Sequence, residues 1–311
     1  MKILFVADVH IKLGQKNVPH EWARNRYKLL WSKLNSFDRD CTIFGGDVFD
    51  RIPSMEEVEV FFEMLKSISG NKLIYPGNHE STSKYGTFFT HFKESVQPFS
   101  TEIIDTYTTY PDFSILPYNE LKKDFWHKYA GQILFTHVRG EIPPHVKPEV
   151  DLSLFSNWSL VFAGDLHAHS NSQKNIVYPG SPVTTSFHRS ITRNENGCIL
   201  IDTDVGEYSF IDLEMPQLIR QTVTSPDKMV PTDYHHTIYE IVGDIVDLKQ
   251  VENTELLDKK ITNKKTQSTL NLQGMTIEEE LIEYLIEVLG VSDPESIMSE
   301  YYDSIKGTEV G

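Results

Sequence analysis

Five short apolar segments in the first 170 residues of this chain each end in residues that can bind a metal ion. Each segment has the length and residue content of a buried strand. In chain order, they run into Asp8-Val-His10, Gly46-Asp47-Val-Phe-Asp50, Gly77-Asn78-His79-Glu80, His137 and Gly164-Asp165-Leu-His167-Ala-His169. Because active sites in α/β proteins lie beyond the carboxyl ends of the strands, we expect these five turns to converge on one site.

The first 215 or so residues alternate strand-like segments with helical patterns. The predicted strands are Lys2–Ala7, Cys41–Gly45, Lys72–Pro76, Phe113–Leu116, Gln132–Thr136, Leu160–Ala163, Cys198–Asp202 and Tyr208–Leu213. Helices are predicted at Glu21–Leu34 and Met55–Ile68, and Ser54 and Glu57 have the spacing of a capping box at the start of the second. This order predicts an α/β fold, or a sandwich of sheets flanked by helices.

The chain carries a net charge of −16, and ten of its 45 acidic residues lie between Met275 and Gly311. A protein this acidic is not expected to bind duplex DNA tightly by itself, because such binding depends on cationic side chains that displace counterions. If nucleic acid is the substrate, metal ions or a partner must offset the repulsion.

The cysteine content and the apolar segments bear on the location of the protein. Cys41 and Cys198 both lie in strand-like segments, which favours a reducing compartment over a disulfide framework. No apolar segment approaches the roughly 20 residues of a membrane span. Asp8 ends the apolar start of the chain too soon for a signal peptide. We therefore expect a soluble, cytoplasmic protein with no membrane partner.

The candidate ligands are carboxylates, imidazoles and one amide oxygen, with no thiolate. This set favours manganese, iron, zinc or magnesium. Two such ions about 3.5–4 Å apart, bridged by one carboxylate, can generate a hydroxide that attacks phosphorus in line. Each fragment alone is commonplace, since a Gly-Asp pair after a strand is most often a turn. Five fragments in order, each at a strand end, favour a metal site.

In their order, the fragments resemble the motifs of the calcineurin-like metallophosphoesterase superfamily, over residues 1 to about 213. The resemblance implies a double β-sandwich flanked by helices, with a dinuclear metal site. It implies that Asp8 and His10 bind the first metal, that Asp47 bridges both metals, and that Asn78 and His137 bind the second. His79 is then not a ligand: it stabilises the transition state and protonates the leaving oxygen. Asp50 is a candidate for orienting His79.

The last fragment departs from the family pattern of Gly-His-x-His. One alignment makes Asp165 a ligand of the second metal and His167 a ligand of the first. The other alignment uses His167 and His169 but puts Leu166 where the turn glycine belongs. We prefer the first, because the glycine turns the strand end. An extra carboxylate favours manganese, with magnesium as the alternative.

Two downstream segments, Tyr178-Pro179-Gly180-Ser181-Pro182 and Asn196-Gly197-Cys198, resemble the SbcD family of nuclease subunits. The resemblance implies exonuclease activity on duplex DNA ends and endonuclease activity near hairpins. It also implies an SbcC-like ATPase partner with a coiled coil, and a homodimer within a complex that acts in DNA repair, recombination or replication. The compact size indicates a prokaryotic or phage version. The alternative is a protein or small-molecule phosphatase, in which Arg51 would grip a substrate phosphate.

The same layout predicts three regions in the chain. Residues 1–215 form the nuclease domain, residues 216–274 a small capping domain and linker, and residues 275–311 a helical tail. After Pro216 the pattern is irregular, and the linker is polar, with lysine pairs at Lys259-Lys260 and Lys264-Lys265.

The tail pattern predicts a helical hairpin. Thr276 and Glu279 form a capping box that opens a helix ending at Gly290, and Ser292 and Glu295 form a second box. The apolar stripe of the two helices contains Ile277, Leu281, Tyr284, Leu285, Val288, Leu289, Ile297, Tyr301 and Ile305. The hairpin either packs on its own domain or docks into a groove at the base of the partner's coiled coil. We prefer docking, because the stripe is wider than two short helices can bury between themselves.

Overall fold

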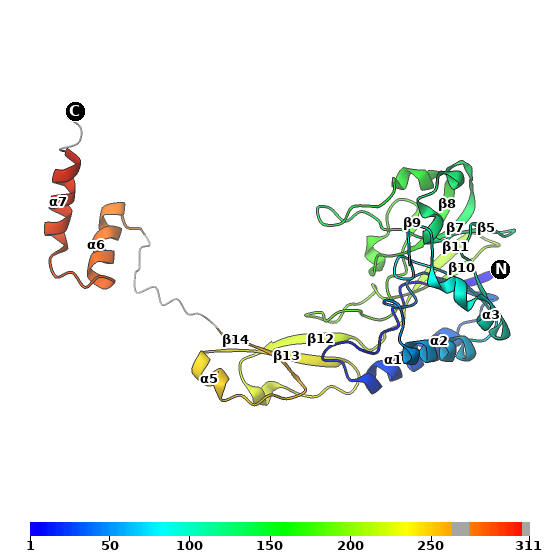
Figure 1. Cartoon of the computed structure of the whole chain (residues 1–311), viewed down its shortest axis with the longest axis horizontal. Coiled ribbons are helices and arrows are strands. Elements are labelled where there is room, and N and C mark those ends of the chain that lie inside the picture. Colours follow the sequence, from blue (N-terminus) through cyan, green and yellow to red (C-terminus); the bar gives the residue numbers. More distant parts are fainter. Residues whose placement is uncertain (263–273, 307–311) are drawn as a thin grey trace. The chain divides into compact units, whose positions relative to one another are not determined.

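The computed structural model describes residues 1–262 and 274–306 (Figure 1). The chain divides into two compact units, Met1–Ile261 and Thr262–Gly311. In the described residues, no helix combines the length and the apolar character that a bilayer crossing requires.

A six-stranded sheet with the order β11-β10-β1-β2-β3-β4 forms one layer of the first unit. Its strands are β1 (Lys2–Val6), β2 (Cys41–Gly45), β3 (Asn71–Tyr75), β4 (Thr101–Ile103), β10 (Gly197–Asp202) and β11 (Glu207–Asp212). The strands β1 to β4 run parallel, whereas β10 is antiparallel to both of its neighbours. The carboxyl ends of β1, β2 and β3 therefore meet at one edge of the sheet.

A five-stranded sheet with the order β5-β6-β7-β8-β9 forms the second layer. Its strands are β5 (Thr108–Thr109), β6 (Ser114–Leu116), β7 (Gly131–His137), β8 (Trp158–Gly164) and β9 (Ile176–Val177). Only β5 is antiparallel to its neighbour. His137 and Gly164, the last residues of β7 and β8, lie side by side in the sheet register.

The helices of the first unit are mostly short. The α-helices are α1 (His20–Asn35), α2 (Met55–Ser67), α3 (Lys93–Val96), α4 (Tyr118–Leu121) and α5 (Ile245–Lys249). The 3-10 helices are η1 (Phe88–Phe92), η2 (Gln97–Phe99), η3 (Asp124–Lys128), η4 (Leu152–Asn157), η5 (His169–Asn171) and η6 (Pro226–Lys228). The capping box of Ser54 and Glu57 is present at the start of α2, as predicted.

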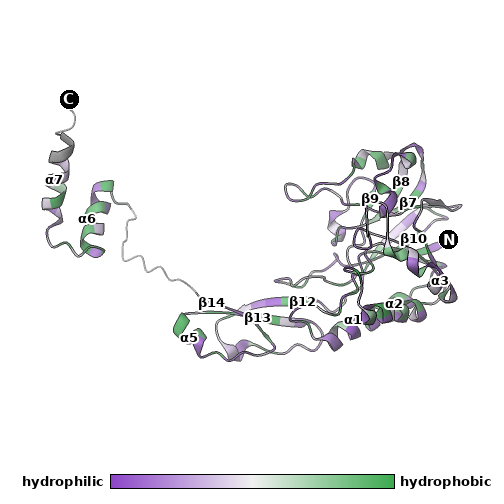
Figure 2. Cartoon of the chain, viewed as in Figure 1, coloured by the Kyte–Doolittle hydropathy of each residue, from purple (hydrophilic) through white to green (hydrophobic). Residues whose placement is uncertain are grey.

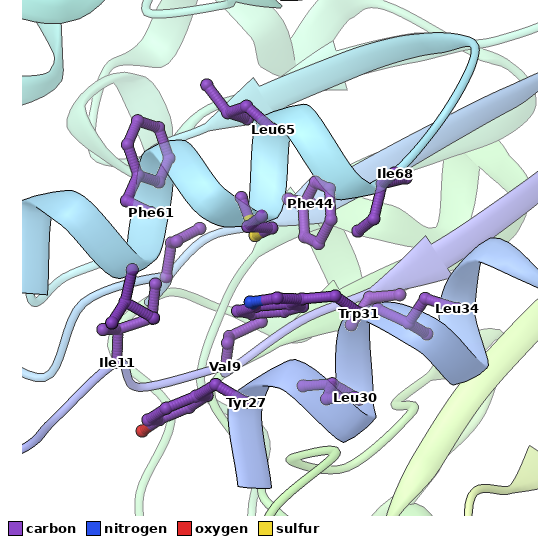
Figure 3. Packing of buried hydrophobic residues seen from close by; sticks show 14 of the residues in the cluster. Val9, Ile11, Tyr27, Leu30, Trp31, Leu34, Phe44, Phe61, Leu65 and Ile68 are labelled. Carbon is purple, nitrogen blue, oxygen red and sulfur yellow. The ribbon is translucent and has the colours of Figure 1, made fainter. Parts of the chain in front are cut away.

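The alternation of side chains along β1 shows how the layers pack. Leu4 and Val6 belong to a cluster with apolar residues of α1 and α2, whereas Ile3 and Phe5 belong to a cluster shared with β7 and β8. Both helices are amphipathic, and Figure 2 shows hydrophobic and hydrophilic residues alternating along them. Figure 3 shows the first cluster, in which Trp31 of α1 lies among residues of β2 and α2. Helices therefore cover the outer face of the six-stranded sheet, and the two sheets bury their inner faces against each other.

This arrangement confirms the predicted sandwich of sheets flanked by helices. All eight predicted strands and both predicted helices are present, with ends that differ by at most two residues. The apolar periodicity of these segments reflects burial on one or both faces, so the sequence pattern and the packing coincide.

After Pro216 the sequence pattern is irregular and predicts no particular strand, yet the described part of this region is regular. A three-stranded sheet of β12 (Leu218–Val223), β13 (His236–Gly243) and β14 (Leu257–Thr262) occupies it. These strands are difficult to recognise in the sequence because charged residues occupy positions where an apolar side chain would be expected. In β14, for example, Lys259 pairs with Glu240 of β13 at 2.8 Å, and the strand lacks a clear apolar alternation. The sheet lies in the same compact unit as the sandwich, and the boundary at residue 215 stays a prediction. Lys264 and Lys265 lie outside the described residues.

The second unit contains α6 (Ile277–Glu287) and α7 (Pro294–Lys306). The capping box of Thr276 and Glu279 is present, and Gly290 has the positive φ of 65° expected after a helix end. The second predicted capping box is wrong, because α7 begins at Pro294 and the Asp293 carboxylate accepts the backbone N–H of Ser296 at 3.3 Å. An aspartate directly before an N-terminal proline thus caps this helix.

Candidate metal centre

Left-handed backbone conformations mark the turns that follow the strands. Asp8, His10, Asp47 and Asp165 have φ values of 56°, 47°, 49° and 99°. A non-glycine residue in such a conformation costs of the order of 1–3 kcal/mol and persists only where its surroundings hold it. Here the Asp8 N–H donates to the Gly46 carbonyl at 3.1 Å, and the His10 N–H donates to the Asp47 carbonyl at 2.9 Å. The turns after β1 and β2 therefore hold each other in place.

One group of candidate ligands surrounds the Asn78 side chain. The Asn78 Oδ1 atom lies 2.9 Å from His137 Nε2 and 3.2 Å from both Asp47 Oδ2 and Asp165 Oδ1. A rotated amide would place its nitrogen at the same point and donate to these three atoms. In either orientation, His137 Nε2, Asp47 Oδ2 and Asp165 Oδ1 surround the same Asn78 atom. Ligands of one octahedral ion at about 2.1 Å stand about 3 Å apart, so these residues fit a divalent cation.

A second group of candidate ligands shares Asp47 with the first. The Nε2 atoms of His10 and His167 are only 3.0 Å apart, and the ligand atoms of Asp8, His10 and His167 all lie within 4.8 Å of one another. The Oδ2 atom of Asp47 lies 3.8 Å from His10 Nε2 and 3.5 Å from His137 Nε2. Asp47 therefore stands between the two groups, where a bridging carboxylate would stand.

Burial sets the charge state of the imidazoles. It lowers the pKa of His10 to about 3 and also lowers the pKa of His167, so both rings are neutral and offer a lone pair to a metal. Burial also acts to lower the pKa of His137, but neighbouring carboxylates, Asp47 foremost, outweigh it and hold that pKa well above its usual value. The carboxylates thus favour positive charge at the centre.

Glycines leave the room that the ligands need. A Cβ atom added to Gly77 would clash with the Asp47 carboxylate, and one added to Gly46 would clash with the His137 ring. The glycines of the strand-end fragments therefore serve close approach as well as the turn itself.

Glu80 holds two of the turns together, although no role follows for it from the sequence alone. Its fully buried carboxylate accepts the backbone N–H groups of Asp47 at 2.9 Å, Phe49 at 2.8 Å and Gly77 at 2.8 Å. Burial raises the pKa of Glu80 to about 8. The sequence signal that could have indicated this role is the position of Glu80 in the fragment Gly77-Asn78-His79-Glu80, whose other residues lie at the candidate site.

His79 lies at the open side of the centre, with 36% of its side chain exposed. Its Nδ1 lies 2.5 Å from the Asp50 carbonyl, which can only accept, so Nδ1 carries a proton and Nε2 faces the centre, 3.8 Å from Asp47 Oδ2. Asp50 thus contacts His79 through its backbone, while its carboxylate pairs with Lys12 at 2.7 Å. His79 also falls within 4.8 Å of candidate ligand atoms of His10 and Asp47, so its role as an acid rather than a ligand stays a prediction.

The structure brings Asp165, and not His169, to the centre. His169 donates from Nδ1 to the Tyr178 carbonyl at 2.6 Å, and its ring stacks on Phe210 with 4.0 Å between the centroids. The Asp165 carboxylate faces Asn78, as described above. The sequence-based sites Asp8, His10, Asp47, Asn78, His137, Asp165 and His167 therefore form two adjoining groups, and His79 borders them.

Comparison with known proteins places the chain in a family. The calcineurin-like phosphoesterase family model matches residues 1–190. A protein of Escherichia phage T5 named "Probable exonuclease subunit 1" is 42% identical over 302 residues, which cover 93% of each chain. A protein of Invertebrate iridescent virus 6, named as phosphoesterase 244L, is 24% identical over 67% of this chain and 79% of its own. The crystal structure of TT1561 of Thermus thermophilus covers 67% of this chain and 96% of its own, with a TM-score of 0.42 and 13% identity.

The family match spans more than half of the chain, and the phage relative is similar over nearly all of it. The fold and the convergent carboxylates and imidazoles agree with this match. The chain belongs to the calcineurin-like phosphoesterase family, whose members hydrolyse phosphoester bonds with divalent metal ions.

Proposed function

We propose that this chain is the nuclease subunit of an SbcCD-type complex and hydrolyses phosphodiester bonds in DNA. It acts as an exonuclease on duplex ends and as an endonuclease near hairpins, with two manganese ions, or magnesium as the alternative. The observation that carries this proposal is the 42% identity, over 93% of both chains, with a phage protein named as an exonuclease subunit. We further propose that it works as a homodimer in the bacterial or phage-infected cytoplasm, in DNA repair, recombination or replication.

The side chains of the centre have distinct tasks in this proposal. When bound, the ions supply a hydroxide nucleophile and stabilise charge on the phosphate. Asp47 holds the two ligand groups together, because its Oδ2 atom lies within 3.8 Å of both His10 Nε2 and His137 Nε2. His79 donates a proton to the leaving oxygen from Nε2, and the Asp50 carbonyl fixes the ring by accepting from Nδ1.

Arg51 argues against the alternative of a phosphatase. Its Nη2 atom lies 3.1 Å from Glu57 Oε1, and that buried carboxylate also accepts the N–H groups of Leu13 and Ser54. The guanidinium is thus engaged with the cap of α2. Nη2 would have to leave this carboxylate before it could take part in a two-point grip on a phosphomonoester, as the phosphatase interpretation requires.

The proposal is tested by incubating the full chain and manganese with three substrates: an end-labelled duplex, a phosphopeptide and p-nitrophenyl phosphate. We expect nucleotides to be released from the duplex, and Asp47→Asn to serve as the inactive control. Rapid hydrolysis of the two monoesters, with the duplex left intact, would contradict the nuclease proposal and support the phosphatase alternative.

The helical tail is proposed to bind the SbcC-like ATPase. Several apolar side chains of α6, α7 and the turn between them are exposed to solvent: Ile277 (85%), Leu281 (38%), Leu289 (58%) and Ile297 (43%). Leu285 and Met298 are the large apolar residues buried among the described residues of this unit. The side chain of Ile305 lies outside the described residues. An apolar helical face of this kind suits a groove at the base of a coiled coil, with basic residues there to meet the acidic tail.

Deletion of residues 276–311 should abolish co-purification with the ATPase and leave the manganese-dependent activity of the isolated subunit intact. A sharper variant, Ile277→Asp with Leu289→Asp, should do the same, whereas Ser299→Ala on the exposed surface of α7 should bind normally. Unfolding of the truncated protein, or unchanged binding, would show that the tail belongs to the core of its own chain.

A further inference from the structure

Arg139 lies two residues after His137, on the loop that leaves β7, and its guanidinium grips the Asp165 carboxylate with two bonds. Nε donates to Oδ2 at 2.9 Å and Nη2 donates to Oδ1 at 3.1 Å. This parallel fork is the strongest and most directional way in which a side chain can hold a carboxylate. The Asp165 carboxylate is 5% exposed, and the Arg139 side chain is 41% exposed.

The grip decides which Asp165 oxygen faces the candidate metal position. Oδ1 lies 3.2 Å from the Asn78 Oδ1 atom and 3.9 Å from His137 Nε2 and also accepts from Arg139 Nη2, whereas Oδ2 accepts from Arg139 Nε on the side away from Asn78 and His137. The backbone of Asp165 is also constrained, because its N–H donates to the Asp8 carboxylate at 3.0 and 3.1 Å. With the backbone held on one side and Oδ2 on the other, the carboxylate cannot turn freely about its χ2 angle.

Charge points to the same role. Asp8, Asp47 and Asp165 bring three buried carboxylates into one small volume, where like charges repel. Among the residues that the structure describes, no lysine or arginine other than Arg139 pairs with any of the three. Water reaches the exposed side of the guanidinium and screens its repulsion of a nearby cation.

We propose that Arg139 is a positioning residue for the second metal: it holds Asp165 Oδ1 toward the point that Asn78 and His137 also face. The inference rests on the proposed dinuclear centre. Hydrogen-bonded partners that orient a metal ligand commonly contribute about 10–100-fold to metal affinity. Arg139 acts through Asp165 and touches neither the ion nor the substrate in this role.

Manganese titration of the metal-stripped full chain by calorimetry tests the inference without any measurement of activity. Wild type should bind two ions. Arg139→Ala should weaken one of the two sites by about 10–100-fold and leave the other unchanged. The matched control is Arg24→Ala, which breaks an arginine–carboxylate pair with Glu63 on the outer helices α1 and α2, contacts none of the candidate ligands and should leave both affinities unchanged.

A second background separates positioning from a general structural effect. An imidazole at position 165 offers one ligand nitrogen and has no carboxylate for Arg139 to orient. In an Asp165→His background, Arg139→Ala should therefore cause no measurable further loss of affinity. An equal loss in both backgrounds, or no loss in either, would overturn the inference while leaving the two-ion centre in place.

Two other outcomes are equally decisive. Fewer than two ions bound to wild type would overturn the proposed centre, and this inference with it. If Arg139→Ala does not fold, Arg139→Gln replaces it, because the amide keeps donor groups but cannot form the two-point fork. Arg139→Gln should weaken the same site, and wild-type affinity in that variant would exclude a positioning role.

Discussion

The metal centre and the helical hairpin both begin as plain sequence patterns, yet they differ in what the chain itself provides for them. At the centre, strand-end residues meet partners from distant segments and are buried: Asp8 and His137 are inaccessible to solvent. In the hairpin, the helices form from local signals, but Ile277 and Leu289 stay 85% and 58% exposed. The candidate ligands are thus buried by contacts within one chain, whereas the two tail helices leave apolar side chains exposed, as the proposed docking on a partner requires.

Neutralising one carboxylate should break the centre and leave the hairpin unaffected. Asp47→Asn should reduce activity below detection, because a neutral amide bridges two dications poorly. The number of manganese ions per chain, measured by mass spectrometry of the purified protein, should fall below two. The matched change Glu287→Gln at the end of α6 should leave both quantities unchanged. A fully active Asp47→Asn protein would contradict the assignment.

A change at the rim of the centre should be smaller and should separate chemistry from metal binding. His79→Ser should lower nuclease turnover by roughly 10²–10⁴-fold, as removal of a general acid does. Manganese content should hardly change, because all of the proposed ligands remain. Loss of both ions together with activity would identify His79 as a ligand.

Metal binding should stabilise the first unit and not the hairpin. When the free manganese concentration is 100 times the dissociation constant of a site, binding at that site adds about 2.7 kcal/mol to the free energy of unfolding. Scanning calorimetry with and without manganese should therefore show a higher Tm that a chelator reverses. The same increase in Tm is expected for a chain that lacks residues 276–311. If the increase disappears in that chain, the hairpin contributes to metal binding and the two units are not independent.

The smallest effect is expected when the same capping motif is removed from each of the two regions in turn. Ser54→Ala in α2 and Thr276→Ala in α6 each remove a side-chain acceptor from a helix N-terminus, at a cost of about 1 kcal/mol. The first should lower the urea midpoint of the sandwich. The second should lower the helical circular dichroism signal without moving that midpoint. A shifted midpoint in the second variant would show that α6 contributes to the stability of the sandwich.

Prediction succeeded where burial imposes a simple period. The eight strands and the helices α1 and α2 pack one or two apolar faces into the sandwich, and that packing is visible as sequence periodicity. The strands β12, β13 and β14 were not predicted, because their charged side chains pair across the sheet, as Arg220 and Asp258 do at 3.0 Å. Prediction misplaced the cap of α7, because Asp293, Ser292 and Glu295 are all plausible capping residues by type.

The candidate site divides in the same way. The metal-binding residue types follow strands directly, so their convergence could be predicted from the sequence alone. The contacts that hold them could not: Glu80 with three backbone N–H groups, Asp50 with His79 through a carbonyl, and Arg51 with Glu57. Each of these depends on the exact approach of two turns.

Local sequence signals were sufficient to predict the sandwich, the strand-end candidate ligands and the two tail helices, because apolar period, turn glycines and capping boxes act over a few neighbouring residues. Only the tertiary structure shows the contacts behind the preferred alignment: Asp165 faces Asn78, His169 donates to the Tyr178 carbonyl, and Arg139 holds Asp165 in place. The physical reason is that the left-handed turn after β8 gives the Asp165 side chain a direction different from that of His169, four residues later. That direction is set by the Asp8 carboxylate, which accepts the Asp165 N–H from a different strand end, 157 residues away along the chain.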